Sequence, residues 1–305
     1  MYWGEDLDER LYEGIEETQI EGVEPIRAGL PITHWSYSSL MCFLRNPLAW
    51  YKRYVEKVYD TPSSPAGIIG RAAHVALQHF YGLPVRDRTQ TGGIAKGGAI
   101  DLGLEYLRNV PDFEVNFGKA KTKREKKEKR ASMEREYLQA IGFYLEKPPK
   151  YNVVAIEEKS TIKVDGLKLP IRAISDLVVR SAVDKKALDI VDHKFVDSFS
   201  SLGGQKTLFI IQAIFNYYTV QNTHGKPVRR FILQECRKRR NADGKSQMRR
   251  YIIEYAKCKE EFAIFHRLIR DATAEIARER LYLPNPSDMF EGENSFDIYK
   301  LGLAG

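Results

Sequence analysis

The middle of the chain alternates apolar and polar residues in the manner of β-strands. Three such segments follow one another: YNVVAIEEKSTIKV, LKLPIRAISDLVVR and ALDIVDHKF. Asp165-Gly166 separates the first two, and Asp-Gly between β-rich runs favours a hairpin turn. Residues 151–195 therefore predict a three-stranded antiparallel meander, which any fold of this chain has to contain.

Helical patterns flank the predicted meander on both sides. Before it come SYSSLMCFLRNPLAWYKRYV, which Asn46-Pro47 divides into two short helices, and GIIGRAAHVALQHFYG. After it come a helix in QKTLFIIQAIFNYYTVQN, a hairpin turning at residues 241–244, and an amphipathic helix over residues 258–281. The order helix, three strands, helix, strand predicts an α/β fold in which helices flank a mixed central sheet.

A glycine-rich stretch, TGGIAKGG, lies within residues 84–110. It lacks the Gly-Lys-Ser/Thr ending with which a P-loop holds a nucleotide phosphate. We therefore expect a flexible connection here rather than a P-loop.

The chain carries a formal net charge of +7, which favours a polyanionic partner, either nucleic acid or a membrane surface. Much of the basic charge lies in KAKTKREKKEKR and RKRRNADGKSQMRR. The first run is a solvated helix face, a mobile segment or a DNA contact. The first residues are acidic, and no apolar stretch approaches the roughly 20 residues that span a bilayer, so we expect a soluble cytoplasmic protein without a membrane partner.

Asp192 and Lys194 stand in an apolar strand, where burying them costs free energy unless something compensates. Strand alternation places both on one face, with Leu188 and Ile190. The neighbouring strand brings a second carboxylate, Asp176. Two close carboxylates repel, and a divalent cation with oxygen ligands, Mg²⁺ or Mn²⁺, relieves that repulsion. A structural Asp–Lys pair is the alternative interpretation.

Four motifs in order give the chain a family resemblance. They are the Ser-x-Ser helix with its Pro before aromatic residues, the GRAAH segment that ends at His74, Asp176, and the DHK triplet that begins at Asp192; Gln212 then follows in the next helix. The sequence resembles the RecB-like branch of the PD-(D/E)XK nuclease superfamily over about residues 36–220. This resemblance implies a restriction-endonuclease-like core with helical additions.

The resemblance also implies a site and an activity. It implies a metal-dependent DNA nuclease, an exonuclease, that hydrolyses phosphodiester bonds in recombination, replication or repair. The stand-alone size favours a protein that a phage encodes. His74, Asp176, Asp192 and the His193 carbonyl would hold the cation, while Lys194 and Gln212 would act on the scissile phosphate. The residues expected to contact DNA are Lys119, Lys121, Lys123, Arg124, Lys126, Lys127, Arg237, Lys238, Arg239, Arg240 and Tyr217.

The sequence departs from the family pattern at two places. Asn216 stands where the family usually has Tyr, and Tyr217 follows it. Many relatives hold an iron–sulfur cluster on four cysteines, but Asn46 occupies the first cysteine position and no Cys follows Cys258. We therefore predict no cluster. Glu157 or Glu158 could assist a metal, although an exposed strand carboxylate is the favoured interpretation.

We expect one nuclease domain behind an N-terminal arm. The arm covers residues 1–35 and the domain residues 36–305, divided into a helical part with His74 and a basic insertion (36–150), the catalytic sheet and helix (151–236), and a basic hairpin with the C-terminal helix (237–305). DNA, as single strands or duplex ends, is the expected partner, together with a single-strand-binding or annealing protein. The alternatives are an inactive nucleic-acid-binding or scaffolding subunit of the same fold, and a CRISPR adaptation nuclease.

Overall fold

The computed structural model describes residues 29–58, 62–89, 94–200, 202–241, 246–278 and 281–283. Most of the predicted arm and the C-terminal residues 284–305 lie outside these ranges. The elements are β1 (Trp35–Ser36), α1 (Tyr37–Arg45), α2 (Pro47–Trp50), a π-helix (Tyr51–Val55), α3 (Pro65–Gly82), α4 (Val85–Thr89), α5 (Ile94–Asn109), α6 (Lys123–Glu146), β2 (Val153–Ile162), β3 (Ile171–Arg180), β4 (Leu188–Val196), α7 (Leu202–His224), β5 (Val228–Arg237), β6 (Met248–Glu254) and α8 (Lys259–Ile276).

Within these ranges, six strands form one mixed sheet. β2, β3 and β4 pair antiparallel, which confirms the predicted meander. β5 runs parallel to β4 because α7 connects them by a crossover, and β6 returns antiparallel to β5. The predicted α/β class with a mixed sheet flanked by helices is therefore confirmed.

The sheet opens between β3 and β4. These strands pair only from Leu177 opposite Val191 to Arg180 opposite Leu188, at one end of β3. The short strand β1 takes the same edge of β3 at its other end, where Trp35 pairs with Ile171. Among the described residues, no strand pairs on that edge with the stretch of β3 between these two pairings, which includes Asp176. Side chains and helices can therefore approach the backbone there.

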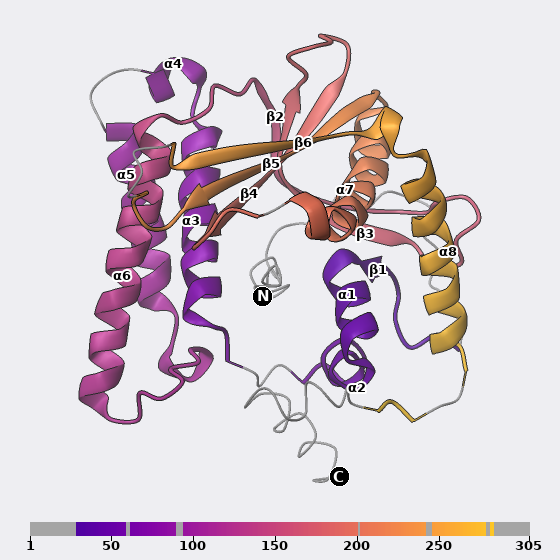
Figure 1. Ribbon diagram of the computed structural model, residues 1–305, viewed down its shortest axis with the longest axis horizontal. Helices are drawn as coiled ribbons and strands as arrows, with labels where there is room; N and C mark the ends of the chain where they lie inside the picture. Colours follow the sequence, from indigo (N-terminus) through magenta and orange to yellow (C-terminus); the bar gives the residue numbers. More distant parts are fainter. Residues whose placement is uncertain are drawn as a thin grey trace.

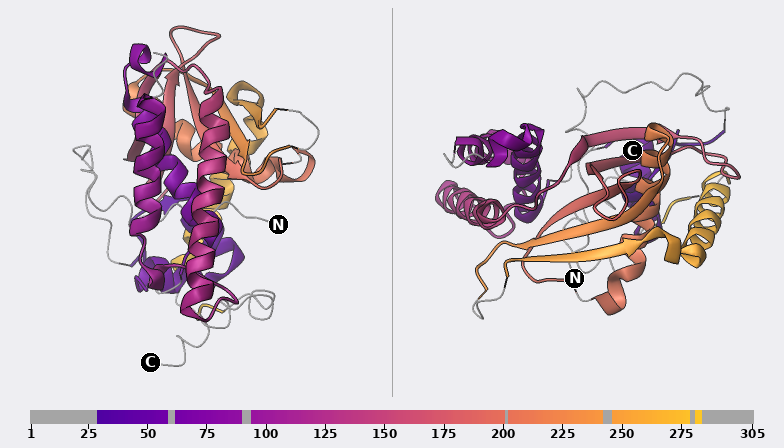
Figure 2. Two further views of the ribbon diagram at one scale, coloured as in Figure 1. Left: turned by 90° about the vertical axis from the view of Figure 1, so that its left-hand side faces the viewer. Right: turned by 90° about the horizontal axis from the view of Figure 1, so that it is seen from above.

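Helices cover the two faces of the sheet (Figure 1). α3, α5 and α6 stand together on one side, and Figure 2 shows them running alongside one another. Leu177 and Val179 of β3 pack into the core of this three-helix group. Val178 and Ile190 point to the opposite face, where they pack with residues of α7. Strand alternation thus divides β3 and β4 between two cores.

The first helices begin as the sequence predicts. Ser36 caps α1 by accepting a hydrogen bond from the Ser39 backbone at 3.1 Å. Asn46 ends α1 and caps α2, with Pro47 in the first turn, so the predicted division into two short helices is confirmed. Every helix in the described ranges is too short or too polar to span a bilayer.

The expectation of a flexible connection at TGGIAKGG is wrong from residue 94 onward. Residues 91–93 lie outside the described part of the chain, but Ile94 begins α5, which includes Gly97 and Gly98. α5 packs on α3 and α6, and Leu107 is fully buried in their common core. Tertiary packing outweighs the low helix propensity of the two glycines.

The basic run forms the start of a helix. Thr122 caps α6 by accepting from the Glu125 backbone at 3.2 Å, and the Glu125 carboxylate accepts from the Thr122 backbone at 2.8 Å. Lys126 and Arg130 lie over the ring of Phe117. Residues 123–130 of the run therefore form a helix with mostly exposed basic side chains, and a DNA contact by them stays a prediction.

Gly103 marks the closest approach within the three-helix group. A Cβ added there would overlap the Ala72 carbonyl of α3 and the Tyr137 hydroxyl of α6. We expect Gly103→Ala to lower the free energy of unfolding by about 1–3 kcal/mol, because the helices must separate. Gly142→Ala in α6 is the control, since a Cβ there meets nothing within 4 Å, and it should gain about 0.5–1 kcal/mol. Urea unfolding of both variants tests this, and equal effects would contradict it.

Candidate active site

Asp176 and Asp192 lie where β3 and β4 separate. Each is 4% exposed. The register that pairs Leu177 with Val191 would place these two residues opposite each other one step further along, where the ladder has ended. Instead of a ladder bond, the His193 backbone N–H donates to Asp176 Oδ2 at 2.6 Å. The sheet opening therefore brings two buried carboxylates close together, as the sequence predicts.

α3 brings His74 to the same place. Its Nδ1 lies 3.6 Å from Asp176 Oδ2 and 3.6 Å from Glu157 Oε1. Its Nε2 lies 3.1 Å from the His193 carbonyl oxygen. Burial alone lowers the pKa of His74, but Asp176 and Glu157 outweigh that effect and raise the pKa to about 9. The protonated imidazole thus supplies positive charge between two carboxylates.

Glu157 corrects the sequence-based expectation of an exposed strand carboxylate. It is 7% exposed, and the pairings of Ile156 with Leu177 and of Glu158 with Ser175 place it opposite Asp176. Its φ of 47° lies in the left-handed region, which costs free energy for a residue with a side chain. The hairpin register is the signal that could have identified Glu157, because it relates this position to Asp176.

These side chains fit a divalent cation. Ligand atoms of His74, Glu157 and Asp176 all lie within 4.8 Å of one another. One imidazole with carboxylate oxygens is a donor set that Mg²⁺ or Mn²⁺ accepts. Asp192 Oδ2 is buried and receives no hydrogen bond, although the Lys194 ammonium lies 3.3 Å away. Asp192, which the sequence predicts as a ligand, does not belong to that group of three, although Asp176 and His74 both act on its pKa. The group of three supports a metal site, and the unsatisfied Asp192 oxygen adds a fourth candidate ligand.

Lys194 and Gln212 both engage Asp192. The Gln212 amide of α7 donates to Asp192 Oδ1 at 2.8 Å. Burial lowers the pKa of Lys194, but Asp192 and Asp176 outweigh it and raise the pKa above its ordinary value, so the ammonium stays charged. Burial also raises the pKa of Asp192, against the influence of Lys194. Gln212 therefore fixes the orientation of Asp192 and leaves Oδ2 toward the site.

His193 links the sheet to the three-helix group. Its side chain points away from Lys194, as strand alternation predicts, and its Nε2 is hydrogen-bonded to the Tyr144 hydroxyl at 2.8 Å. Tyr144 is hydrogen-bonded in turn to the Tyr81 hydroxyl at 2.8 Å. The peptide groups of the same residue contact Asp176 and His74. Two buried tyrosines thus hold the residue whose backbone frames the candidate site.

The family's Tyr position takes a structural role here. Asn216 Oδ1 accepts from Ser175 Oγ at 2.6 Å, and its amide donates to the Gln212 carbonyl at 3.1 Å. Tyr217 points elsewhere and packs its ring against Tyr255 and Phe262.

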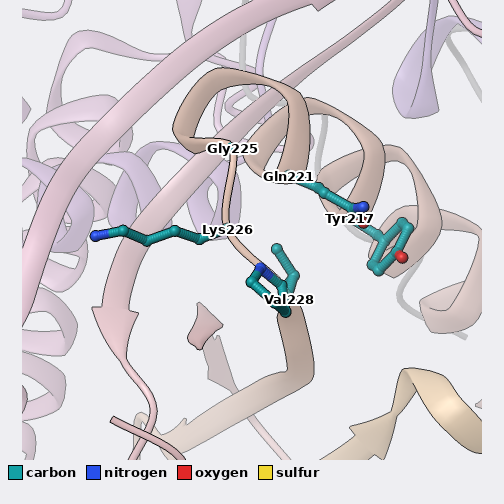
Figure 3. A pocket seen from close by; sticks show the side chains of 6 residues that line it. Tyr217, Gln221, Gly225, Lys226 and Val228 are labelled. Carbon is teal, nitrogen blue, oxygen red and sulfur yellow. The ribbon is translucent and has the colours of Figure 1, made fainter. Parts of the chain in front are cut away.

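Tyr217 also lines a pocket of about 360 Å³ with Gln221, Lys226 and Val228 (Figure 3). Val228 begins β5, five residues before Leu233, the partner of Asp192. The pocket therefore lies about 16 Å along the strand from Asp192. The structure does not bring Tyr217 to the carboxylates, and a DNA contact by Tyr217 stays a prediction.

The basic residues expected to contact DNA differ in their exposure and in their contacts within the protein. Lys238 is 3% exposed and lies 3.3 Å from Asp197, and Arg237 donates to the Asp197 carbonyl at 3.1 Å. These two have structural roles, whereas Arg239 and Arg240 are exposed. The exposed cations at the start of α6 are Lys119, Lys121, Lys123, Arg124 and Lys127, while Lys126 lies over Phe117.

We expect Glu157→Gln to weaken the binding of Mg²⁺ or Mn²⁺ at least about tenfold, because it removes a charge from the candidate ligand set. The measurement is the cation dependence of the thermal unfolding midpoint. Glu158→Gln is the matched control, since Glu158 points to His224 at 2.9 Å and not to the site. Equal cation affinities in the two variants would contradict the role of Glu157.

We expect Tyr144→Phe to weaken cation binding about tenfold as well, because the freed His193 side chain no longer fixes its carbonyl. It should also lower stability by about 1–3 kcal/mol, since Nε2 stays buried without a partner. Tyr137→Phe on the same helix is the control, because its hydroxyl donates to Ile100 at 2.8 Å. A stability loss without any change in cation affinity would show that Tyr144 only supports packing.

Comparisons with curated proteins and with solved structures give little information about this chain. A search of the curated proteins found no match. Among solved structures 13 chains match. One, the crystal structure of SSO0001, is 15% identical over 87% of this chain and 93% of that chain, with a TM-score of 0.31.

The sequence profile of the PD-(D/E)XK nuclease superfamily matches residues 34–289, which include the whole candidate site. The mixed sheet flanked by helices agrees with the restriction-endonuclease-like core of that superfamily. The match extends over most of the sequence, and this chain therefore belongs to the PD-(D/E)XK nuclease superfamily.

Proposed function

We propose that this protein is a Mg²⁺- or Mn²⁺-dependent deoxyribonuclease. Membership of the superfamily indicates a metal-dependent nuclease, and the choice of DNA and of these cations is our proposal. The observation that carries it is the buried group of His74, Glu157 and Asp176 beside the unsatisfied Oδ2 of Asp192. The excess of basic residues supports a polyanionic substrate.

Each residue of the site has a distinct task in phosphodiester hydrolysis. His74, Glu157, Asp176, Asp192 and the neighbouring backbone carbonyl would hold the cation. When bound there, a divalent cation activates the attacking water and neutralises charge on the phosphate.

Lys194 would act directly on the phosphate, by donating to a non-bridging oxygen or by orienting the water. Its side chain is 23% exposed, so a substrate can reach the ammonium. Gln212 acts on the site through Asp192, because its amide donates a hydrogen bond to that carboxylate. In the free protein its amide positions a carboxylate, and a contact of Gln212 with the scissile strand stays a prediction.

Exposed cations away from the site would hold the DNA backbone. We propose this role for the start of α6 and for Arg239 and Arg240, whose side chains are exposed. Lys127 lies 17 residues before Tyr144 on α6, which is about 26 Å along the helix. Because Tyr144 contacts His193 at the candidate site, Lys127 would hold the DNA backbone well away from the scissile phosphate. Such contacts attract phosphates without reading bases, so binding should weaken steeply with salt.

We further propose that the protein acts from DNA ends as an exonuclease of the RecB-like branch, in recombination, replication or repair, and that it is encoded by a phage. The partner would be a single-strand-binding or annealing protein. An inactive nucleic-acid-binding subunit and a CRISPR adaptation nuclease are the alternatives. The orphaned Asp192 oxygen favours activity over a scaffold, because a scaffold gains nothing from an unsatisfied buried carboxylate.

The decisive experiment is a time course on end-labelled linear DNA and closed circular DNA with Mg²⁺, Mn²⁺ or EDTA. We expect cleavage of linear DNA with either metal and none with EDTA. Lys194→Met should slow cleavage about 10²–10³-fold, since it removes the cation beside the phosphate. Asp192→Asn should abolish detectable cleavage, while both variants still bind DNA.

Controls separate the possible failures. Lys257→Met removes an exposed lysine paired with Glu254 at 3.0 Å, and it should cleave like the wild type. A wild type as inert as Asp192→Asn would favour the binding subunit. Cleavage of closed circles at the same rate as linear DNA would contradict the exonuclease mode, and RNA cleaved in preference to DNA would contradict the substrate.

A further inference from the structure

Arg71 is a buried cation that the proposed hydrolysis does not use. It lies on α3, one turn before His74, and is 7% exposed. Its Nε donates to the hydroxyl of Tyr106 on α5 at 3.1 Å. Arginine is almost never buried to this extent unless an anion accompanies it. The missing anion therefore needs an explanation.

No carboxylate pairs with Arg71 in the part of the chain that the structure describes. Its single hydrogen bond there goes to a neutral phenol. Neither terminal nitrogen donates to another group of the described chain, and neither is among its fully buried atoms without a partner. The guanidinium is thus held at Nε, and its two terminal nitrogens are the ones that would form a bidentate pair with an anion.

Arg71 lies close in sequence to His74 of the candidate site, on the same helix. Residues three apart are neighbours on a helix surface, so Arg71 and His74 share one side of α3. One turn corresponds to about 5.4 Å along the axis, and long helical side chains lean toward the N-terminal end. Arg71 therefore stands one turn before His74 on the Pro65 side of α3, and Tyr106 holds its guanidinium toward α5.

We propose that Arg71 binds a phosphate of the DNA backbone adjacent to the scissile phosphate, with Tyr106 holding the guanidinium in place. The inference rests on the proposed nuclease function and extends it to a second phosphate subsite. An arginine fork matches two phosphate oxygens, and the low exposure strengthens that pairing. Arg71 would position the strand so that the next phosphate meets the cation and Lys194.

A purely structural Arg71 makes different predictions. If the side chain only fills space between α3 and α5, replacing it with Met should lower stability and leave DNA binding unchanged. If the guanidinium awaits a phosphate, removing an unpaired buried charge should leave stability equal or higher. DNA binding should then weaken.

The first test measures binding and cleavage by Arg71→Met. We expect KM to rise about ten- to a hundredfold, as for the loss of a charge-assisted hydrogen bond, with kcat changed less than about twofold. In the cleavage-deficient Lys194→Met background, the slope of log K against log salt should fall by about one. Arg71→Lys should fall between, because it keeps the charge and loses the fork. Unchanged KM and slope would overturn the proposal.

The second test changes the DNA rather than the protein, and compares the wild type with Arg71→Met. Uncharged methylphosphonates replace, one at a time, the phosphates on either side of the scissile one. One position should weaken wild-type binding about tenfold and have no further effect on Arg71→Met, because each change removes the same contact. Additive losses at every position would overturn the proposal.

The two proposals fail in distinguishable ways. A wild type that binds DNA without cleaving it contradicts the nuclease function, yet the binding measurements still decide the role of Arg71. Normal cleavage with an unaltered Arg71→Met contradicts only the second phosphate subsite. Tyr106→Phe is the remaining comparison, since it keeps the guanidinium and removes the hydroxyl that holds Nε. It should raise KM less than Arg71→Met does.

Discussion

The end of the β3–β4 pairing is the constraint on which the rest of the structure depends. Beyond Leu177 and Val191 the ladder stops, and the two carboxylates that follow occupy the opening. A continuous ladder would satisfy the backbone there. Because the strands separate, the His193 N–H turns to Asp176 and its carbonyl to His74. The candidate site is therefore built from backbone groups that a regular sheet would have used.

His193 makes the site depend on the helical layer. Strand alternation turns Asp192 and Lys194 toward α7, while the imidazole between them enters the core that contains Tyr81 and Tyr144. A change in how α6 packs must therefore move the same peptide that contacts Asp176. The three-helix group thus supports the chemistry as well as the fold, because it fixes one backbone segment of β4.

The sequence predicts those parts of the site that depend on local strand periodicity. Period-two alternation was sufficient to place Asp192 and Lys194 on one face and the His193 side chain on the other, because strand geometry is local. His74 came only from the family resemblance, since a lone His on an apolar helix carries no such information. The sequence does not predict Glu157, because its left-handed backbone and its contact with His74 of α3 appear only in the folded chain. Alternation along the strand carries no signal for either property.

Charge explains why these residues tolerate one another. With His74 neutral, the carboxylates of Glu157, Asp176 and Asp192 outnumber the ammonium of Lys194 by two negative charges, which one divalent cation offsets. The raised pKa of His74 reflects the same imbalance, because a proton supplies part of the missing charge. Cation binding must displace that proton. A polyanion approaching the uncompensated site would meet repulsion, so a metal cation would have to bind before the nucleic-acid strand. Basic side chains outside the cluster would then decide where the strand lies.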